Sequence, residues 1–119
     1  MDNKNIDISI VIISWKMKEL LQSCLQSIYK FTSGINLEII VIDNNSQDGT
    51  SEMIETEFPE IILIKNKENR GVAPARNQGI SIAKGKYVLI LDADVELIEN
   101  SILNLIESLV AESRPARHA

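Results

Sequence analysis

The sequence is poor in the residues from which many functional sites are built, with one cysteine and one histidine among 119 residues. A single cysteine excludes a disulfide framework and a cysteine-based zinc site. Acidic side chains outnumber basic ones by 17 to 12, so the basic footprint of a general nucleic-acid-binding protein is missing. No apolar run approaches the roughly 20 residues of a membrane span, and the N-terminus does not resemble a signal peptide. We therefore expect a cytoplasmic protein of one domain that does not bind nucleic acid.

Four short apolar runs, rich in β-branched residues, are separated by longer polar segments. They cover residues 8–13, 37–42, 61–64 and 87–91. Continuous runs of this length are typical of strands that are buried on both faces, as in parallel sheets. Between and after them lie segments with the periodicity of amphipathic helices, at about 17–31, 48–57, 72–84 and 100–110.

Strands and helices thus alternate four times, which predicts an α/β fold with a mostly parallel sheet of about four strands. Right-handed crossovers leave few topologies, and the commonest doubly wound one has strand order 3-2-1-4. A ligand then binds outside the carboxyl ends of the first and fourth strands. This rule directs attention to Ser14 and Trp15 after the first strand, and to Asp92, Ala93 and Asp94 after the fourth.

The sharpest candidate motif is Asp92-Ala93-Asp94, because it directly follows an apolar run. Side chains two residues apart in a turning segment can converge on one cation. Hard divalent ions such as Mg²⁺ or Mn²⁺ take oxygen ligands and usually keep substrate phosphates in their shell. Asp43 also follows an apolar run, where a carboxylate is rarely buried without a partner. A purely structural role in turns accounts for the nearby Asn, Ser and Gly residues.

For Trp15 and Arg76 the sequence leaves two interpretations open, and for Cys24 it favours a structural role. Trp15 is placed to pack on a nucleotide base or to cover the core. Arg76, early in a predicted helix, suits a phosphate or a carboxylate, and the alternative is a structural ion pair with Asp43 or Asp92. Cys24 lies on the apolar face of a predicted helix, so we interpret it as a core residue.

Taken together, these motifs resemble the N-terminal part of a family 2 glycosyltransferase with the GT-A fold, a three-layer Rossmann-like sandwich. The resemblance covers most of the chain, and its motifs occur in the family's order at residues 8–15, 38–50, 69–79 and 84–94. One departure is Asn44, which follows Asp43 where a second acid is common. That form is similar to the rhamnosyltransferase-type branch and leaves open whether a hexosyl or a rhamnosyl group is transferred.

The resemblance implies a site for a nucleotide-diphospho-sugar donor. Asp43 would hydrogen-bond the base, and Asp92 and Asp94 would hold Mg²⁺ or Mn²⁺. That metal would bridge the diphosphate and act as a Lewis acid on the leaving group. The nucleotide-sugar-binding residues implied are Ser14, Trp15, Asp43, Arg76, Asp92 and Ala93.

By the same resemblance, the full-length enzyme would transfer a sugar from a UDP-, dTDP- or GDP-linked donor to a glycan or lipid-linked acceptor, with inversion. It would do so in the cytoplasm, at the inner face of the membrane. Inversion needs a general base to deprotonate the acceptor hydroxyl. Family members place that base well after the D-x-D motif, so we expect it beyond this chain and expect the chain alone to be inactive.

The domain assignment follows from these motifs. Residues 1–112 are predicted to be the nucleotide-sugar-binding part of a GT-A domain. Residues 113–119 differ in composition and are predicted to be an atypical tail, either a natural frayed end or a segment of non-native origin. A partial sheet would expose an edge and a face, which predicts self-association.

Two other functions remain as alternatives. A nucleotidyltransferase-like domain would share the α/β sheet and the acidic ligands, but it needs a glycine-rich basic loop where this chain has Ser-Trp-Lys-Met at residues 14–17. A non-catalytic α/β interaction domain would use the same acids only as turn residues.

Overall fold

The computed structural model describes residues 5–112, so the predicted tail at residues 113–119 lies outside the described part of the chain. Strands and helices alternate as the sequence predicts. In order they are β1 (Ile8–Ser14), α1 (Lys18–Phe31), β2 (Leu37–Asp43), α2 (Thr50–Glu57), β3 (Ile62–Lys65), α3 (Val72–Ile82), β4 (Tyr87–Asp92) and α4 (Ser101–Glu112). Across residues 5–112, the search for a helix long and apolar enough to cross a membrane finds none.

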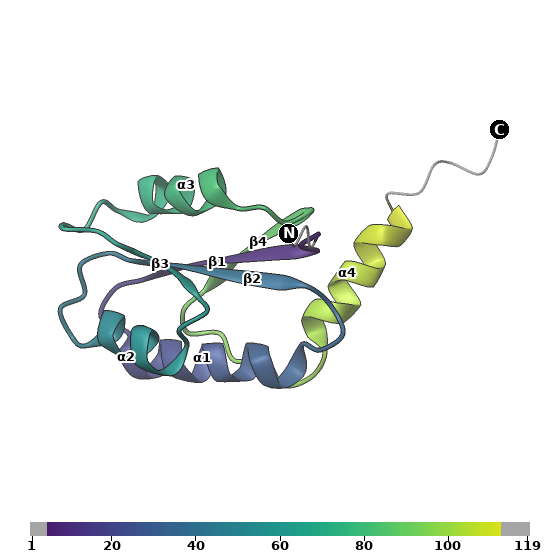
Figure 1. Ribbon diagram of the computed structural model, residues 1–119, viewed down its shortest axis with the longest axis horizontal. Coiled ribbons are helices and arrows are strands. Elements are labelled where there is room, and N and C mark those ends of the chain that lie inside the picture. The colour runs from purple at the N-terminus through teal and green to yellow at the C-terminus, as the bar shows by residue number, and fades with distance from the viewer. Residues whose placement is uncertain (1–4, 113–119) are drawn as a thin grey trace.

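The strands form one parallel sheet with the order β3-β2-β1-β4, which confirms the predicted fold class and topology. Figure 1 shows three layers, with α3 on one face of the sheet and α1 and α2 on the other. The register pairs Ser14 of β1 with Asp43 of β2, and Ile13 of β1 with Asp92 of β4. The carboxyl ends of these three strands therefore meet at one edge of the sheet.

The two faces of β1 supply two separate cores. Ile10 and Ile12 point toward α1 and belong to the larger core, which Leu21 and Leu25 of that helix complete. Val11 belongs to the smaller core beneath α3, with Ala75 of that helix. Neighbouring side chains along a strand point to opposite faces. The position of a residue near the end of its strand therefore determines whether its side chain lies on the α3 side or on the α1 and α2 side.

β3 departs from the expectation that each strand is buried on both faces, since none of its residues is buried, and so does β4. The side chains of β4 alternate, so that Val88 and Ile90 are 43% and 37% exposed while Tyr87 and Leu89 are half-buried. The reason is that β4 lies at the edge of the sheet, whereas α3 packs on β1 and β2. The predicted self-association would depend on this exposed edge and face.

Gly79 allows α3 to lie close to the sheet. A Cβ atom at this position would overlap Val11 Cγ1 and would lie 2.9 Å from Ile42 Cδ1. The backbone of α3 therefore rests directly on β1 and β2. This close contact fixes how the first turns of α3, including Arg76, are presented at the edge of the sheet.

Candidate functional site

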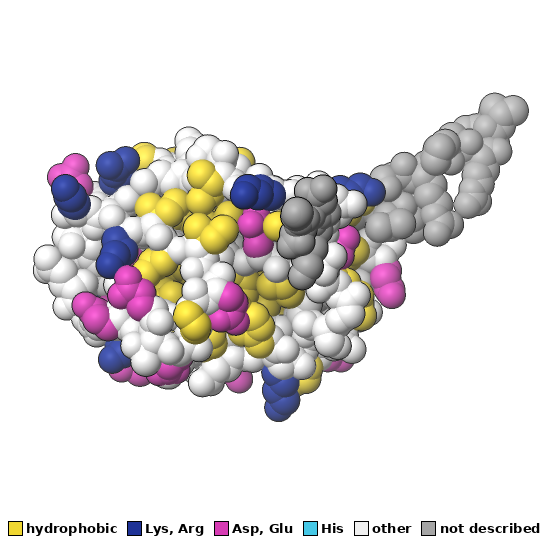
Figure 2. Space-filling model, in the orientation of Figure 1, with side chains coloured by type: hydrophobic (Ala, Val, Ile, Leu, Met, Phe, Trp, Pro, Cys, Tyr) yellow, Lys and Arg dark blue, Asp and Glu magenta, His cyan; other side chains and the backbone are white. Residues whose placement is uncertain are grey.

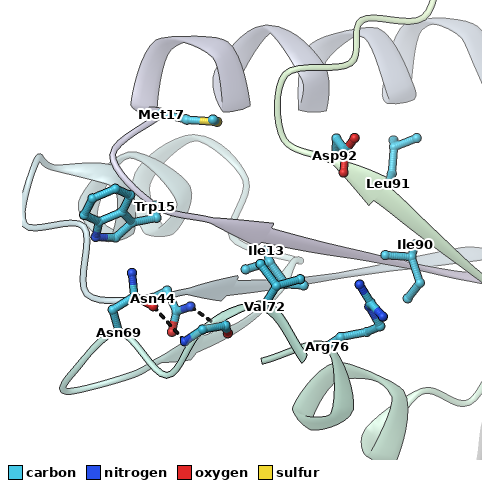
Figure 3. A pocket seen from close by; sticks show the side chains of 11 residues that line it. Ile13, Trp15, Met17, Asn44, Asn69, Val72, Arg76, Ile90, Leu91 and Asp92 are labelled. Atoms are coloured by element: carbon cyan, nitrogen blue, oxygen red, sulfur yellow. Dashed lines mark hydrogen bonds between the residues drawn. The ribbon is translucent and has the colours of Figure 1, made fainter. Parts of the chain in front are cut away.

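A cleft of about 350 Å³ opens at the carboxyl ends of β1 and β4. Three of the predicted site residues, Trp15, Arg76 and Asp92, line it together, although 77 positions separate the first from the last in the sequence. Figure 3 shows that the loop after β1, the start of α3 and the end of β4 supply these side chains. The remaining lining is largely apolar, with Ile13 and Ile90 among the contributors.

Trp15 lines the cleft, is 47% exposed and is not among the side chains that pack against either core. The loop that carries it is held by a hydrogen bond from the backbone N–H of Lys16 to Ser46 Oγ, 2.9 Å long. Lys16 has a φ of 57°, an uncommon backbone conformation for a residue other than glycine. Its Nζ lies 4.9 Å from the centroid of the Trp15 ring, within range of a cation–π contact. The ammonium group of Lys16 therefore lies beside one face of the indole.

Arg76 is exposed and forms no salt bridge with Asp43 or Asp92 in the described part of the chain. Figure 3 shows its side chain rising from α3 toward the strand that carries Asp92. The ion-pair alternative raised by the sequence is therefore not what the structure contains. The guanidinium keeps its donors for water or for a ligand in the cleft.

Neither Asp43 nor Ser14 lines this cleft, and Asp43 lines a separate hollow of about 200 Å³ beside the turn after β2. Asp43 is buried on the α2 side, where Oδ1 accepts a hydrogen bond from Ser46 N (3.0 Å) and Oδ2 accepts one from Ser51 Oγ (2.6 Å). Ser14 is also buried, and its Oγ has no hydrogen-bond partner among the described residues. The carboxylate that the sequence singled out for base recognition thus holds the turn after β2 in place.

The D-x-D segment divides between interior and surface. Ala93 is buried in the larger core, whereas Asp92 and Asp94 are exposed. The turn is closed by a hydrogen bond from Val95 N to Asp92 O, 3.1 Å long. No cluster of three or more His, Cys, Asp or Glu side chains is found within residues 5–112, so any metal here has at most these two carboxylates from the described chain.

Cys24 of α1 lies beneath this turn, with Sγ 4.0 Å from Asp92 O. It is fully buried, as the sequence predicts for a core residue. Burial and, to a smaller extent, the negative charge of Asp94 raise the pKa of the Cys24 thiol to about 11. The thiol is therefore protonated and chemically inert at neutral pH.

Sequence reasoning missed two amide side chains of the cleft, Asn44 and Asn69. Both are asparagines, a residue type that is common in turns, so neither stood out in the sequence. A signal was nevertheless present, because Asp43 and Asn44 are consecutive at the end of a strand and so point to opposite faces of the sheet. Once Asp43 is committed to the α2 side, Asn44 must face the side of α3 and the cleft.

A family model described as glycosyl transferase family 2 matches residues 9–114. The chain belongs to this family. It is 35% identical over 106 residues to the UDP-Glc:alpha-D-GlcNAc-diphosphoundecaprenol beta-1,3-glucosyltransferase WfaP of Escherichia coli, which is 88% of this chain and 42% of that protein. The glycosyltransferase chain thus spans less than half the length of the curated relatives it matches first.

Solved glycosyltransferase structures show the same fold. The mannosyltransferase PcManGT from Pyrobaculum calidifontis, in complex with GDP-Man and Mn²⁺, superposes with a TM-score of 0.77 at 25% identity, over 95% of this chain and 34% of that one. TarS residues 1–349 from S. aureus, in complex with UDP, superposes with a TM-score of 0.78 at 21% identity, over 90% and 32%. These likenesses confirm the GT-A architecture that the four motifs predicted.

Proposed function

We propose that the cleft binds the nucleotide diphosphate of a sugar donor, as one part of a family 2 glycosyltransferase. The observation that carries this proposal is the convergence of Trp15, Arg76 and Asp92 on one cleft. An aromatic face, a cation and a carboxylate are the three groups needed for a base, a diphosphate and a metal. The cleft's volume of about 350 Å³ lies within the usual range of small-molecule sites.

Each side chain has a role suited to its chemistry. The exposed indole of Trp15 offers a flat apolar surface on which a nucleobase can stack. Arg76 presents a guanidinium that forms no salt bridge among the described residues, and its fork matches phosphate oxygens. Asp43 would hydrogen-bond the base in this proposal, since each of its oxygens accepts one bond within the protein and keeps a second lone pair, and the side chain lines a hollow of about 200 Å³ beside the turn after β2.

Asp92 and Asp94 fit a divalent cation. Both carboxylates are exposed and lie on the same turn, and Mg²⁺ is commonly bound through one or two carboxylates plus substrate phosphates and water. We propose Mg²⁺ or Mn²⁺ at this turn, supported by the Mn²⁺ complex of the mannosyltransferase PcManGT. Such an ion supplies Lewis-acid stabilisation of the leaving nucleotide diphosphate.

The whole protein, in this proposal, transfers a hexosyl or rhamnosyl group to a glycan or lipid-linked acceptor with inversion, at the inner face of the membrane. The relative WfaP, whose name gives UDP-Glc and a diphosphoundecaprenol-linked acceptor, supports this class. The 119-residue chain is expected to bind the donor without transferring sugar. The cleft is lined by one carboxylate, Asp92, which the metal would engage, so a base for the acceptor hydroxyl is not supplied there.

Titration calorimetry with UDP, GDP and dTDP, each with and without Mn²⁺, tests the donor site. We expect at least one of the three to bind in the micromolar to millimolar range and to bind more tightly with Mn²⁺. Absence of metal-dependent binding for all three would instead support the non-catalytic interaction domain. Sugar transfer by the purified chain would contradict the expected division between donor binding and catalysis.

A further inference from the structure

Gly71, which lies in the wall of the cleft, has a backbone conformation that other residues rarely adopt, with φ 83° and ψ 176°. Both its backbone N–H and its backbone carbonyl form hydrogen bonds with side chains. Gly71 N donates a hydrogen bond to Asn69 Oδ1 (2.8 Å), and Gly71 O accepts one from Asn44 Nδ2 (3.1 Å). Figure 3 shows both bonds at the point where the chain enters α3. The Asn44 bond therefore ties the start of the helix that carries Arg76 to the end of β2, while the Asn69 bond closes a local turn.

Asn44 is 2% exposed, and its hydrogen bonds fix the orientation of its amide. Its Oδ1 accepts a bond from Arg70 N (3.1 Å), and its Nδ2 donates the bond to Gly71 O. A backbone N–H can only donate and a backbone carbonyl can only accept, so these partners determine which end of the amide is oxygen. An acid at position 44 could accept from Arg70 but could not donate to Gly71. The position thus requires a side chain with both a donor and an acceptor.

The network continues away from the cleft through two more amides. Asn66, directly after β3, donates from Nδ2 to Asn44 Oδ1 (3.0 Å). Asn66 and Gln78 of α3 also form a reciprocal pair, with bonds of 2.8 and 2.9 Å. Gln78 does not line the cleft, but it joins the middle of α3 to the end of β3. The network therefore links the end of β2, the end of β3 and the start of α3.

We propose that Asn44, Asn66 and Gln78 form an amide network that positions residues 69–71 and the start of α3 for binding of the donor nucleotide. This inference rests on the proposed function of the cleft. Asn66 and Gln78 are positioning residues, because they do not line the cleft and act through Asn44, which lines it and holds Arg70 and Gly71. The network also accounts for the amide at position 44, since an acid there would place an oxygen against the Gly71 carbonyl.

Gln78 provides the decisive test, because a change there can alter nucleotide affinity only through position. We expect Gln78→Ala, which removes both bonds to Asn66, to weaken binding of UDP, GDP or dTDP (whichever the wild type binds with Mn²⁺) by about tenfold. Gln78→Glu keeps an acceptor for Asn66 Nδ2 but sets a second oxygen against Asn66 Oδ1, so its affinity should also fall below that of the wild type. Gln22→Ala removes an exposed amide bond to Glu57 on the far side of the sheet and is the matched control. All titrations are run well below the unfolding temperature, with equal ellipticity as the criterion of folding.

Amide hydrogen exchange supplies a second, independent measurement. Asn44→Ala should accelerate exchange of the Arg70 and Gly71 amides relative to the wild type, while amides within β1 stay protected. Wild-type affinity in both Gln78 variants would overturn the proposal. Should the wild type bind none of the three nucleotides, the proposed function fails, and exchange alone decides the network: unchanged rates in Asn44→Ala would refute it, and faster rates would support it.

Discussion

Gly79 of α3 packs against Val11 of β1 without space for a side chain between them. The contact is made at the middle of the sheet, on the face opposite α1. It sets the height of α3 above the sheet and, with it, the position of Arg76 one turn earlier in the helix. The geometry of the cleft therefore depends on a residue that does not line it.

Gly79→Ala should destabilise the fold by about 1–3 kcal/mol, because the added methyl group must displace Val11 or Ile42 in a packed core. Urea unfolding followed by circular dichroism measures this change. Ser81→Ala, on the exposed side of the same helix, should leave the free energy of unfolding within about 0.5 kcal/mol of the wild type. Equal stabilities of the two variants would show that the contact is looser than the structure indicates.

Trp15→Ala should weaken nucleotide binding by about 1–3 kcal/mol, the usual contribution of an aromatic side chain that stacks on a base. Trp15→Phe should retain part of this energy, since it keeps an aromatic face. Stability should change little in either variant, because the indole is 47% exposed. Calorimetric titration of the same nucleotide measures all three proteins, and an unchanged affinity in Trp15→Ala would exclude stacking in this cleft.

Arg76→Ala should show which part of the nucleotide the guanidinium contacts. If the guanidinium contacts the diphosphate, the variant should lose affinity for UDP or GDP by about tenfold while its weaker affinity for the matching nucleoside stays the same. Raising the salt concentration should reproduce part of this loss in the wild type, as expected for a charge-assisted contact near the surface. Equal losses for nucleotide and nucleoside would instead indicate a structural role for Arg76.

Asp92→Asn and Asp94→Asn should each reduce the gain in nucleotide affinity that Mn²⁺ produces, because a neutral amide is a weaker ligand for a hard cation than a carboxylate. Binding without metal should be unaffected or slightly stronger, as one negative charge near the diphosphate is removed. Glu99→Gln, which neutralises an acid outside the lining of the cleft, is the control. A full Mn²⁺ effect in both Asp variants would place the metal elsewhere.

Cys24 should respond to pH in a defined direction. Its pKa is about 11 in the folded protein against an ordinary value of 9.0, so the unfolded chain loses this proton first as the pH rises. The free energy of unfolding should therefore decline between about pH 9 and pH 11, and Cys24→Ala should decline less. At pH 8 a thiol reagent should label the folded protein slowly and the unfolded protein quickly. Rapid labelling of the folded protein would show that the turn over α1 opens readily.

The strand order could be predicted because β1 and β2 are continuous apolar runs separated by amphipathic helices, and few topologies satisfy that alternation. The exposure of Val88 and Ile90 could not be predicted in the same way. An apolar run shows that a strand can be buried on both faces, but not which neighbours cover it. That depends on where α3 rests, which Gly79 decides through a contact distant in sequence.

The site was predictable in part for a similar reason. Trp15, Arg76 and Asp92 follow strand ends or begin a helix, and parallel topology brings such positions together. Asp43 satisfied the same rule but turns to the opposite face, because consecutive side chains at the end of β2 alternate. The role of Asn44 was hidden because its partners are backbone groups of residues 70 and 71, which no local pattern connects to it.

The position of β4 at the edge of the sheet gives the two sides of the cleft unequal freedom to change. The wall that would contact the base is enclosed, since β1 is flanked by β2 and β4 and the loop before α3 is tied down by amides. The opposite wall ends at Asp92, on a strand that pairs only with β1 within residues 5–112. Figure 2 shows hydrophobic side chains reaching the surface among the charged ones on the face in view. Elements added beside β4 could therefore reshape the sugar and acceptor side of the cleft while the nucleotide side stays as it is.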